Sequence, residues 1–352
     1  MLNLQAGLQR VRVPVYLLTG YLGSGKTSLL ARWLKDGALA RPALVINEVG
    51  EVGLDQHVLS GVAESAALIA NTCICCTGLP GMEQALADLF RARLERRLDP
   101  FETVIIETTG LADPMPIMDI FESNELLRER YRLFGVITTI SATSGLQLLG
   151  SHGVMSSQVQ AANLVVVTKT DLATLAEVAA LHAAIAALNG DAGITRSAQA
   201  SLGATAMLDL LAAHPLKKPA KQEHAAAVDV VQPEHTAHVG HDHSHHGADT
   251  LFLSMPHAFK RQALHAQLER WILKHKQSLL RVKGLVLASD GCLITVQWSI
   301  GDEGICMAPF GPRPAGRAEI RPGLTVIVNK NFPRAAWPVL LGAMDAIRTQ
   351  VD

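Results

Sequence analysis

The chain has 352 residues, of which 49% are hydrophobic, and its formal net charge at pH 7 is −1. This length can bury a sizeable core and predicts about two domains. The balanced charge gives no indication of nucleic acid or of a membrane surface as a partner. The sequence contains no run of about 18 apolar residues, which a membrane span would need. We also see no signal-peptide pattern at the N-terminus, so we expect a cytoplasmic location.

Apolar runs alternate with helical patterns up to about residue 210. Strands are predicted at 13–20, 42–48, 103–110, 134–141 and 163–171, and helices at 26–37, 81–98 and 172–188. Strands rich in Val, Ile and Leu that alternate with helices are typical of a parallel sheet covered on both faces. The expected fold class over residues 1–214 is therefore α/β, with a mostly parallel sheet flanked by helices.

A change of composition follows this first unit. Residues 215–249 include the histidine-rich run EHTAHVGHDHSHHGAD, which cannot form a packed core, so we expect a flexible linker. Its imidazoles would bind divalent metals with modest affinity, either as an antenna for a tighter site or incidentally. A small C-terminal α+β domain over 250–352 is predicted from strands at 249–256, 279–289, 292–300 and 324–330 and helices at 257–276 and 333–348.

The segment GYLGSGKT, Gly20 to Thr27, joins a predicted strand to a predicted helix and fits a phosphate-binding loop. Its glycines let backbone N–H groups point at phosphate oxygens, and the following helix adds its dipole. Lys26 is expected to reach the β and γ phosphates, and the Thr27 hydroxyl to ligate Mg²⁺. The predicted phosphate-binding residues are Gly20, Gly23, Ser24, Gly25, Lys26, Thr27 and Ser28.

Two later segments add the rest of a nucleotide site. In IIETTGLADP, a strand delivers Glu107 near the metal, and Gly110 can offer its backbone N–H to a γ-phosphate. In VVTKTDL, Lys169 and Asp171 fit a guanine signature, because the Asp171 carboxylate can accept hydrogen bonds from N1–H and the exocyclic amine of guanine. Adenine would leave that carboxylate unpaired, so the pattern favours guanine.

Three cysteines cluster in NTCICCTG, at Cys73, Cys75 and Cys76. In a reducing compartment, such clusters are more often metal ligands or redox groups than disulfides. Three thiolates suit Zn²⁺, Co²⁺, Ni²⁺ or Cu⁺ and leave a tetrahedral ion one ligand short, which gives a carried ion an exit. The alternative is a set of small buried side chains or a redox pair. Cys292 and Cys306 lie in strand-like segments and are expected in the core.

The ordered segments GYLGSGKTSLL, NEVGEVGLD, NTCICCTG, ETTGLADP and TKTD resemble those of the CobW-type metallochaperone GTPases. This family includes zinc-transfer GTPases and is related to the nickel-insertion GTPases of urease and hydrogenase maturation. The resemblance implies a P-loop NTPase fold and a C-x-C-C metal site, with Glu48 and Glu51 in a switch-like loop. It also implies that Thr168, Lys169 and Asp171 hold guanine, although the family often has Asn where Thr168 stands.

These motifs predict a GTPase that uses GTP, Mg²⁺ and Zn²⁺ and passes zinc to a client metalloprotein. Formation of a homodimer is a further possibility. A γ-phosphate with Mg²⁺ would order the NEVGEVG loop, and Glu48 or Glu51 would complete the metal site in one nucleotide state. Hydrolysis would depend on Lys26, Thr27 and a water oriented by Glu48 or Glu107. The alternatives are a cobalt chaperone for cobalamin or nitrile hydratase maturation, a metal-independent P-loop nucleotidase or kinase, and a non-enzymatic metal buffer based on the histidine run.

Overall fold

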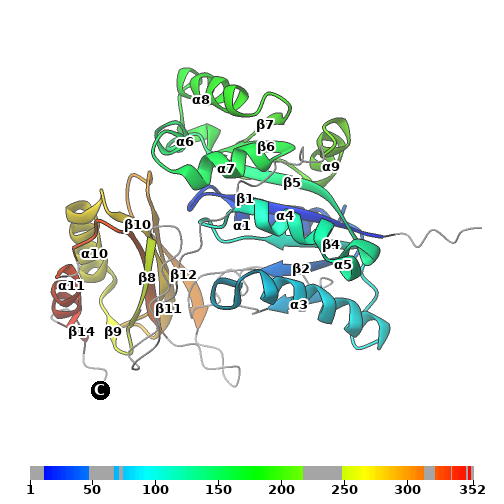
Figure 1. Cartoon of the computed structure of the whole chain (residues 1–352). Helices are drawn as coiled ribbons and strands as arrows, with labels where there is room; N and C mark the ends of the chain where they lie inside the picture. Colours follow the sequence, from blue (N-terminus) through cyan, green and yellow to red (C-terminus); the bar gives the residue numbers. More distant parts are fainter. Residues whose placement is uncertain are drawn as a thin grey trace, which may run out of the picture.

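Two sheets organise the part of the chain that the computed structural model describes, which is residues 12–46, 67–70, 74–216, 248–312, 322–333, 335–345 and 348–349 (Figure 1). Sheet A has the strand order β3-β2-β4-β1-β5-β6-β7, and every neighbouring pair in it is parallel. Its strands are β1 (Val13–Gly20), β2 (Pro42–Ile46), β3 (Ala67–Ala70), β4 (Thr103–Glu107), β5 (Tyr131–Ser141), β6 (Leu164–Thr168) and β7 (Gly193–Ser197). The predicted α/β class with a parallel sheet is confirmed.

Helices cover both faces of sheet A because alternate residues of each strand point to opposite sides. Val15 and Leu17 belong to the core under α3 and α4, whereas Tyr16 and Leu18 belong to the core under α1 and α9. The helical elements of this part are α1 (Lys26–Asp36), α3 (Ile74–Leu94), α4 (Pro114–Ser123), α5 (Glu125–Arg130), α6 (Gly145–Leu149), α7 (Gly153–Ala161), η1 (Thr170–Leu172), α8 (Leu175–Leu188) and α9 (Ala204–Ala213).

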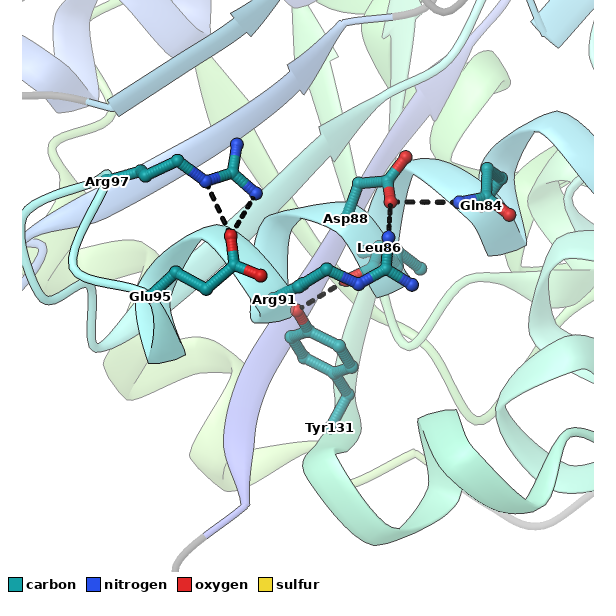
Figure 2. Close-up of polar contacts among 7 residues, drawn as sticks. All are labelled: Gln84, Leu86, Asp88, Arg91, Glu95, Arg97 and Tyr131. Carbon is teal, nitrogen blue, oxygen red and sulfur yellow. Dashed lines mark hydrogen bonds and ion pairs between the residues drawn. The ribbon is translucent and has the colours of Figure 1, made fainter.

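Helix α3 is anchored to sheet A at a point far from its first turn. Tyr131, the first residue of β5, donates a buried hydrogen bond to the Leu86 carbonyl of α3 at 2.9 Å (Figure 2). Burial raises the pKa of Tyr131 well above its ordinary value, so the hydroxyl stays a donor. On the exposed side of the helix, Asp88 accepts hydrogen bonds from Gln84 and Arg91, both at 2.9 Å. The Tyr131 contact therefore joins the middle of α3 to sheet A, alongside the apolar packing of Met82, Leu86 and Leu89.

Sheet B is antiparallel except for one short pair and has the strand order β12-β11-β10-β13-β8, with β9 parallel to β10. Trp271 of α10 and Leu340 of α11 pack with Trp298 on one face of the sheet. Sheet B lies between these two helices and sheet A (Figure 1). The elements are β8 (Ala248–Ser254), β9 (Ala258–Phe259), α10 (Arg261–His275), β10 (Leu279–Ala288), β11 (Cys292–Ser299), β12 (Cys306–Pro312), β13 (Gly323–Asn329), α11 (Ala336–Asp345) and β14 (Arg348–Thr349).

Among the element boundaries in the first unit that differ from the sequence expectations, two lie in motif segments. The helix predicted at 81–98 begins at Ile74, so Gly78 and Pro80 lie inside it. Local propensity favoured a turn there, and tertiary context overrode it. The strand predicted at 163–171 ends at Thr168, because Lys169 takes a left-handed backbone with φ 54° and a short 3₁₀ turn follows.

The expectation that Cys292 and Cys306 are core residues is wrong. Cys306 is exposed and Cys292 is only partly buried. Each is the first residue of its strand, and β12 is an edge strand of sheet B, so neither thiol is covered from all sides.

Several sequence predictions fall outside the described residues. Residues 217–247 include nearly all of the expected histidine-rich linker, so its flexibility and the domain limits at 214 and 249 stay predictions. The NEVGEVG segment at 47–53 is also outside. Within the described ranges, no helix is long and apolar enough to cross a membrane.

Candidate functional site

The carboxyl ends of four neighbouring strands lie in one row at one edge of sheet A. Ala70 of β3 pairs with Ile46 of β2, and Ile46 also pairs with Glu107 of β4. Glu107 pairs in turn with Leu18 of β1, close to Gly20. Because neighbouring strands lie about 4.8 Å apart, β3 is roughly 14 Å from β1. The segments that follow these four strands therefore all start along the same edge.

The loop from β1 to α1 has the geometry of an anion cradle. Gly25 caps α1 with φ 89° and no side-chain hydrogen bond, so the first amides of the helix can bind an anion. Lys26 is buried, with 6% of its surface exposed, and its Nζ donates to the carbonyls of Gly20 at 2.7 Å and Tyr21 at 3.3 Å. The ammonium group is therefore folded over the loop in which a phosphate would lie.

Thr27 and Glu107 place two oxygen ligands beside this loop. Thr27 Oγ1 donates to Glu107 Oε1 at 2.7 Å, and Glu107 is the buried last residue of β4. A hydroxyl and a carboxylate suit Mg²⁺, so these residues fit the ion expected with a nucleoside triphosphate. Gly110, in the loop after β4, lies against the cradle: a Cβ there would come within 2.6 Å of Leu22 N. A side chain at this position would push the two loops apart.

Helix α7 holds the loop after β4 through residues that sequence analysis missed. Gln158 is fully buried, and its Nε2 donates to the carbonyls of Gly110 at 3.3 Å and Ala112 at 3.0 Å. Ser157 Oγ donates at 2.6 Å to Asp113, which also caps α4. Glutamine on a helix is usually exposed, so no sequence signal marks Gln158.

The TKTD signature lies where β6 ends. Thr168 Oγ1 donates to the Ser24 carbonyl at 2.7 Å, which ties β6 to the P-loop. Asp171 Oδ1 accepts a hydrogen bond from Gln199 N, in the loop after β7, at 3.3 Å. The structure thus brings Thr168 beside the anion cradle, and it brings Asp171 to the loop after β7, which the sequence analysis did not single out.

Lys169 has a partner in sheet B that the sequence analysis also missed. Its Nζ lies 2.9 Å from Asp302 Oδ1, in the turn after β11. The two residues are 133 positions apart, so no spacing pattern could have connected them.

Tyr21 and His152 form a neutral pair behind the cradle. The Tyr21 hydroxyl and His152 Nδ1 are 3.3 Å apart, and the ring centroids are 5.0 Å apart. Burial raises the pKa of Tyr21 to about 12 and lowers the pKa of His152 below its ordinary value. Both side chains are therefore uncharged near pH 7, and His152 packs against Tyr21 of the P-loop without adding charge.

The cysteine cluster lies only partly within the described residues. Cys75 and Cys76 belong to the first turn of α3, which follows β3 at the same edge of sheet A as the P-loop. Three expected metal ligands lie outside the described residues: Cys73, Glu48 and Glu51. Among the side chains that the structure does describe, no group of three or more His, Cys, Asp or Glu is arranged to hold a metal. The C-x-C-C site stays a prediction.

Residues 14–196, just over half of the chain, match the family described as CobW/HypB/UreG, nucleotide-binding domain. The chain belongs to the CobW/HypB/UreG family. This membership confirms the resemblance drawn from the ordered motifs. The CobW/HypB/UreG match contains the P-loop, the loop after β4 and the TKTD signature, so the contacts described above lie largely within the nucleotide-binding domain of the family.

The names of two curated relatives of this chain contain the word zinc. Zinc chaperone YjiA of Escherichia coli K12 is 38% identical over 182 residues, 52% of this chain and 56% of the relative. Zinc-regulated GTPase metalloprotein activator 1 of Schizosaccharomyces pombe is 33% identical over 167 residues, 46% of this chain and 39% of the relative. The chain thus spans about half or less of the length of these relatives.

Solved structures of the family also resemble the chain. The Zn(II)-bound YjiA GTPase from E. coli aligns over 96% of this chain and 99% of its own, with 23% identity and a TM-score of 0.45. HypB from Archaeoglobus fulgidus aligns over 57% and 89%, with 21% identity and a TM-score of 0.37.

Proposed function

We propose that this protein is a GTPase that binds zinc at Cys73, Cys75 and Cys76 and transfers it to a client metalloprotein in a GTP-dependent manner. The observation that carries this proposal is the row of strand ends in sheet A. Strand β2, which precedes the NEVGEVG segment, lies between β3, which precedes the cysteines, and β4, which carries Glu107. The switch-like segment therefore starts between the two sites that it would connect.

The nucleotide would be held on two sides. The phosphate side consists of the P-loop residues with Gly110 and Glu107, and the base side consists of Thr168, Lys169 and Asp171. Bound Mg²⁺, held by Thr27 and Glu107, would neutralise charge on the phosphate oxygens. Lys26 would contact the β and γ phosphates, and an acid, Glu107 or Glu48, would orient the attacking water.

Zinc binding and nucleotide binding would be coupled through the segment between β2 and β3. The strands that precede the phosphate and cysteine sites lie roughly 14 Å apart across the row, and the segment after β2 starts between them. If Glu48 or Glu51 serves zinc in one nucleotide state only, zinc must change nucleotide affinity by the same factor as nucleotide changes zinc affinity. The names of the curated relatives favour zinc as the cargo.

The decisive experiment measures zinc affinity by competition with a calibrated chelator, using the chain without residues 234–246. It is run without nucleotide, with Mg·GDP and with a non-hydrolysable Mg·GTP analogue. We expect one tight site whose affinity changes about tenfold or more between nucleotide states, which is about 1.4 kcal/mol of coupling. A parallel titration with Co²⁺ compares the affinities for the two ions and so tests the cobalt alternative.

Two double variants show which thiols bind the metal. Cys75→Ser/Cys76→Ser should abolish the tight site, whereas Cys292→Ser/Cys306→Ser removes as many thiols and should keep it. If zinc affinity is the same in every nucleotide state, the GTP-dependent transfer fails. If the tight site survives Cys75→Ser/Cys76→Ser, the cysteines are structural or redox groups and the chaperone proposal fails.

A further inference from the structure

The proposed nucleotide site is packed against sheet B. Gly23 of the P-loop contacts Ser299, the last residue of β11: a Cβ on Gly23 would lie 2.5 Å from Ser299 Cβ. Leu22 of the same loop shares one buried hydrophobic cluster with Leu280 of β10 and Ile327 of β13. These side chains are 4%, 2% and 3% exposed, so the contact is a well-packed part of the fold.

The turn after β11 directs one carboxylate at Lys169. Asp302 Oδ1 accepts from Lys169 Nζ at 2.9 Å, and Oδ2 accepts from Ser299 N at 2.8 Å. The backbone N–H of Asp302 also donates to the Ser299 carbonyl at 2.9 Å. Both carboxylate oxygens are thus engaged, and the group cannot rotate without losing a hydrogen bond.

The Lys169–Asp302 pair is shielded from solvent more than an ordinary surface pair. The two side chains are 29% and 28% exposed, so salt and water screen their attraction only in part. An ammonium group has three donors, and Asp302 occupies one of them. Lys169 can therefore keep this partner while it contacts a nucleotide.

We propose that Asp302 is a positioning residue for nucleotide binding, so that sheet B completes a guanine site built mainly on sheet A. A free lysine side chain loses rotamer entropy when it is ordered on a ligand. Because Asp302 already orders Lys169 in the folded protein, this rotamer entropy is not lost again when the nucleotide binds. This inference rests on the assignment of Thr168, Lys169 and Asp171 to the base side.

The first test compares Asp302→Asn with Glu303→Gln in the full chain, using a fluorescent GDP analogue. Asparagine keeps the size of Asp302 and an acceptor for Ser299 N, but it removes the charge that holds Lys169. Glu303, the next residue, is exposed and serves as the matched charge control. We expect Asp302→Asn to raise the Kd for GDP about fivefold to tenfold. Glu303→Gln should stay within about twofold.

Measurements of GTP turnover distinguish a positioning role of Asp302 from a catalytic one. At saturating GTP, kcat of Asp302→Asn should stay within about twofold of the wild type while KM rises, because only ground-state binding is affected. Unchanged or tighter GDP binding by Asp302→Asn would overturn the proposal. Tighter binding would mean that Asp302 competes with the nucleotide for Lys169.

A double-mutant cycle with Lys169→Met tests whether Asp302 acts through Lys169. The double variant should bind GDP no more weakly than Lys169→Met alone, whereas additive losses would show that Asp302 merely supports the fold. If Lys169→Met weakens GDP binding and Asp302→Asn does not, the positioning role fails and the guanine site stands. If Lys169→Met binds GDP as the wild type does, the guanine assignment fails together with this inference.

Discussion

The phosphate side and the base side of the proposed site are built in different ways. The phosphate side comes from sheet A, and most of it is one continuous segment from Gly20 to Ser28. The base side gathers Thr168 and Asp171 at the end of β6, Gln199 after β7 and Asp302 from sheet B. A continuous segment needs only the correct local backbone, whereas the assembled side also needs two sheets to pack correctly.

Lys26→Ala gives the largest expected effect, because it removes the buried ammonium of the phosphate side. We expect kcat/KM for GTP to fall roughly 100- to 1,000-fold, as for the loss of one strong electrostatic contact to the transition state. Steady-state phosphate release is the measurement. Lys35→Ala, at the exposed end of the same helix, is the control and should leave turnover unchanged. Wild-type turnover in Lys26→Ala would show that this loop is not the phosphate site.

Glu107→Gln probes the metal ligands of the phosphate side and should have the next largest effect. Glutamine can still accept the hydrogen bond from Thr27, but the negative charge beside the ion is lost. We expect kcat to fall roughly 10- to 100-fold and the Mg²⁺ concentration for half-maximal turnover to rise. Glu102→Gln, which breaks the exposed pair with Arg41, should change neither. An unaltered Mg²⁺ titration curve for Glu107→Gln would remove Glu107 from the metal site.

Thr168→Val tests the link between the two sides. Valine keeps the shape of threonine but leaves the Ser24 carbonyl without the hydroxyl that it accepts from. The free energy of unfolding should fall by about 1 to 2 kcal/mol, and GDP binding should weaken a few-fold. Thr168→Ser retains the hydroxyl and should recover most of both losses. Equal stability of the two variants in urea would show that the hydroxyl contributes nothing to the link.

The smallest expected effect concerns pH and His152, which packs behind the phosphate side. Burial lowers the pKa of this imidazole in the folded state, so the unfolded chain takes up the proton first as pH falls. Its contribution to stability is fully present above the ordinary pKa of 6.5 and is lost as pH falls toward the folded value. His152→Phe keeps the ring contact with Tyr21 and should make the loss of stability between about pH 7 and pH 5 less steep.

His275, the last residue of α10 beside sheet B, provides the matched comparison for this pH effect. Its pKa is lowered by burial and, to a smaller extent, by Lys274, so it should also reduce stability as pH falls. His275 packs against Trp271 and Phe332, far in the sequence from the nucleotide motifs. The degree to which GDP protects the protein from acid unfolding should be the same in the wild type and in His275→Phe. A reduced protection in His275→Phe would mean that the two sheets respond to pH as one unit.

The sequence predicted β1, β2, β4, β5 and β6 of sheet A, because parallel strands that are buried on both faces appear as continuous apolar runs. It missed β3 and β7, which lie at the two ends of the strand order. Predictions were wrong where local propensity decided them. Pro80 lies inside α3 and not before its start, and Cys306 lies exposed on an edge strand although its segment is strand-like in pattern. Hydrophobicity alone does not say which strand will lie at an edge.

The sequence by itself determined the anion cradle, because the backbone freedom of Gly25 and the neighbouring Lys26 act within one turn of the chain. It also determined that the TKTD residues lie at the end of a buried strand. Only the tertiary structure decided that Gln158 supports the loop after β4 and that Asp302 meets Lys169. Contacts between distant segments leave no spacing pattern, since hydrophobic packing, which brings such segments together, is not directional.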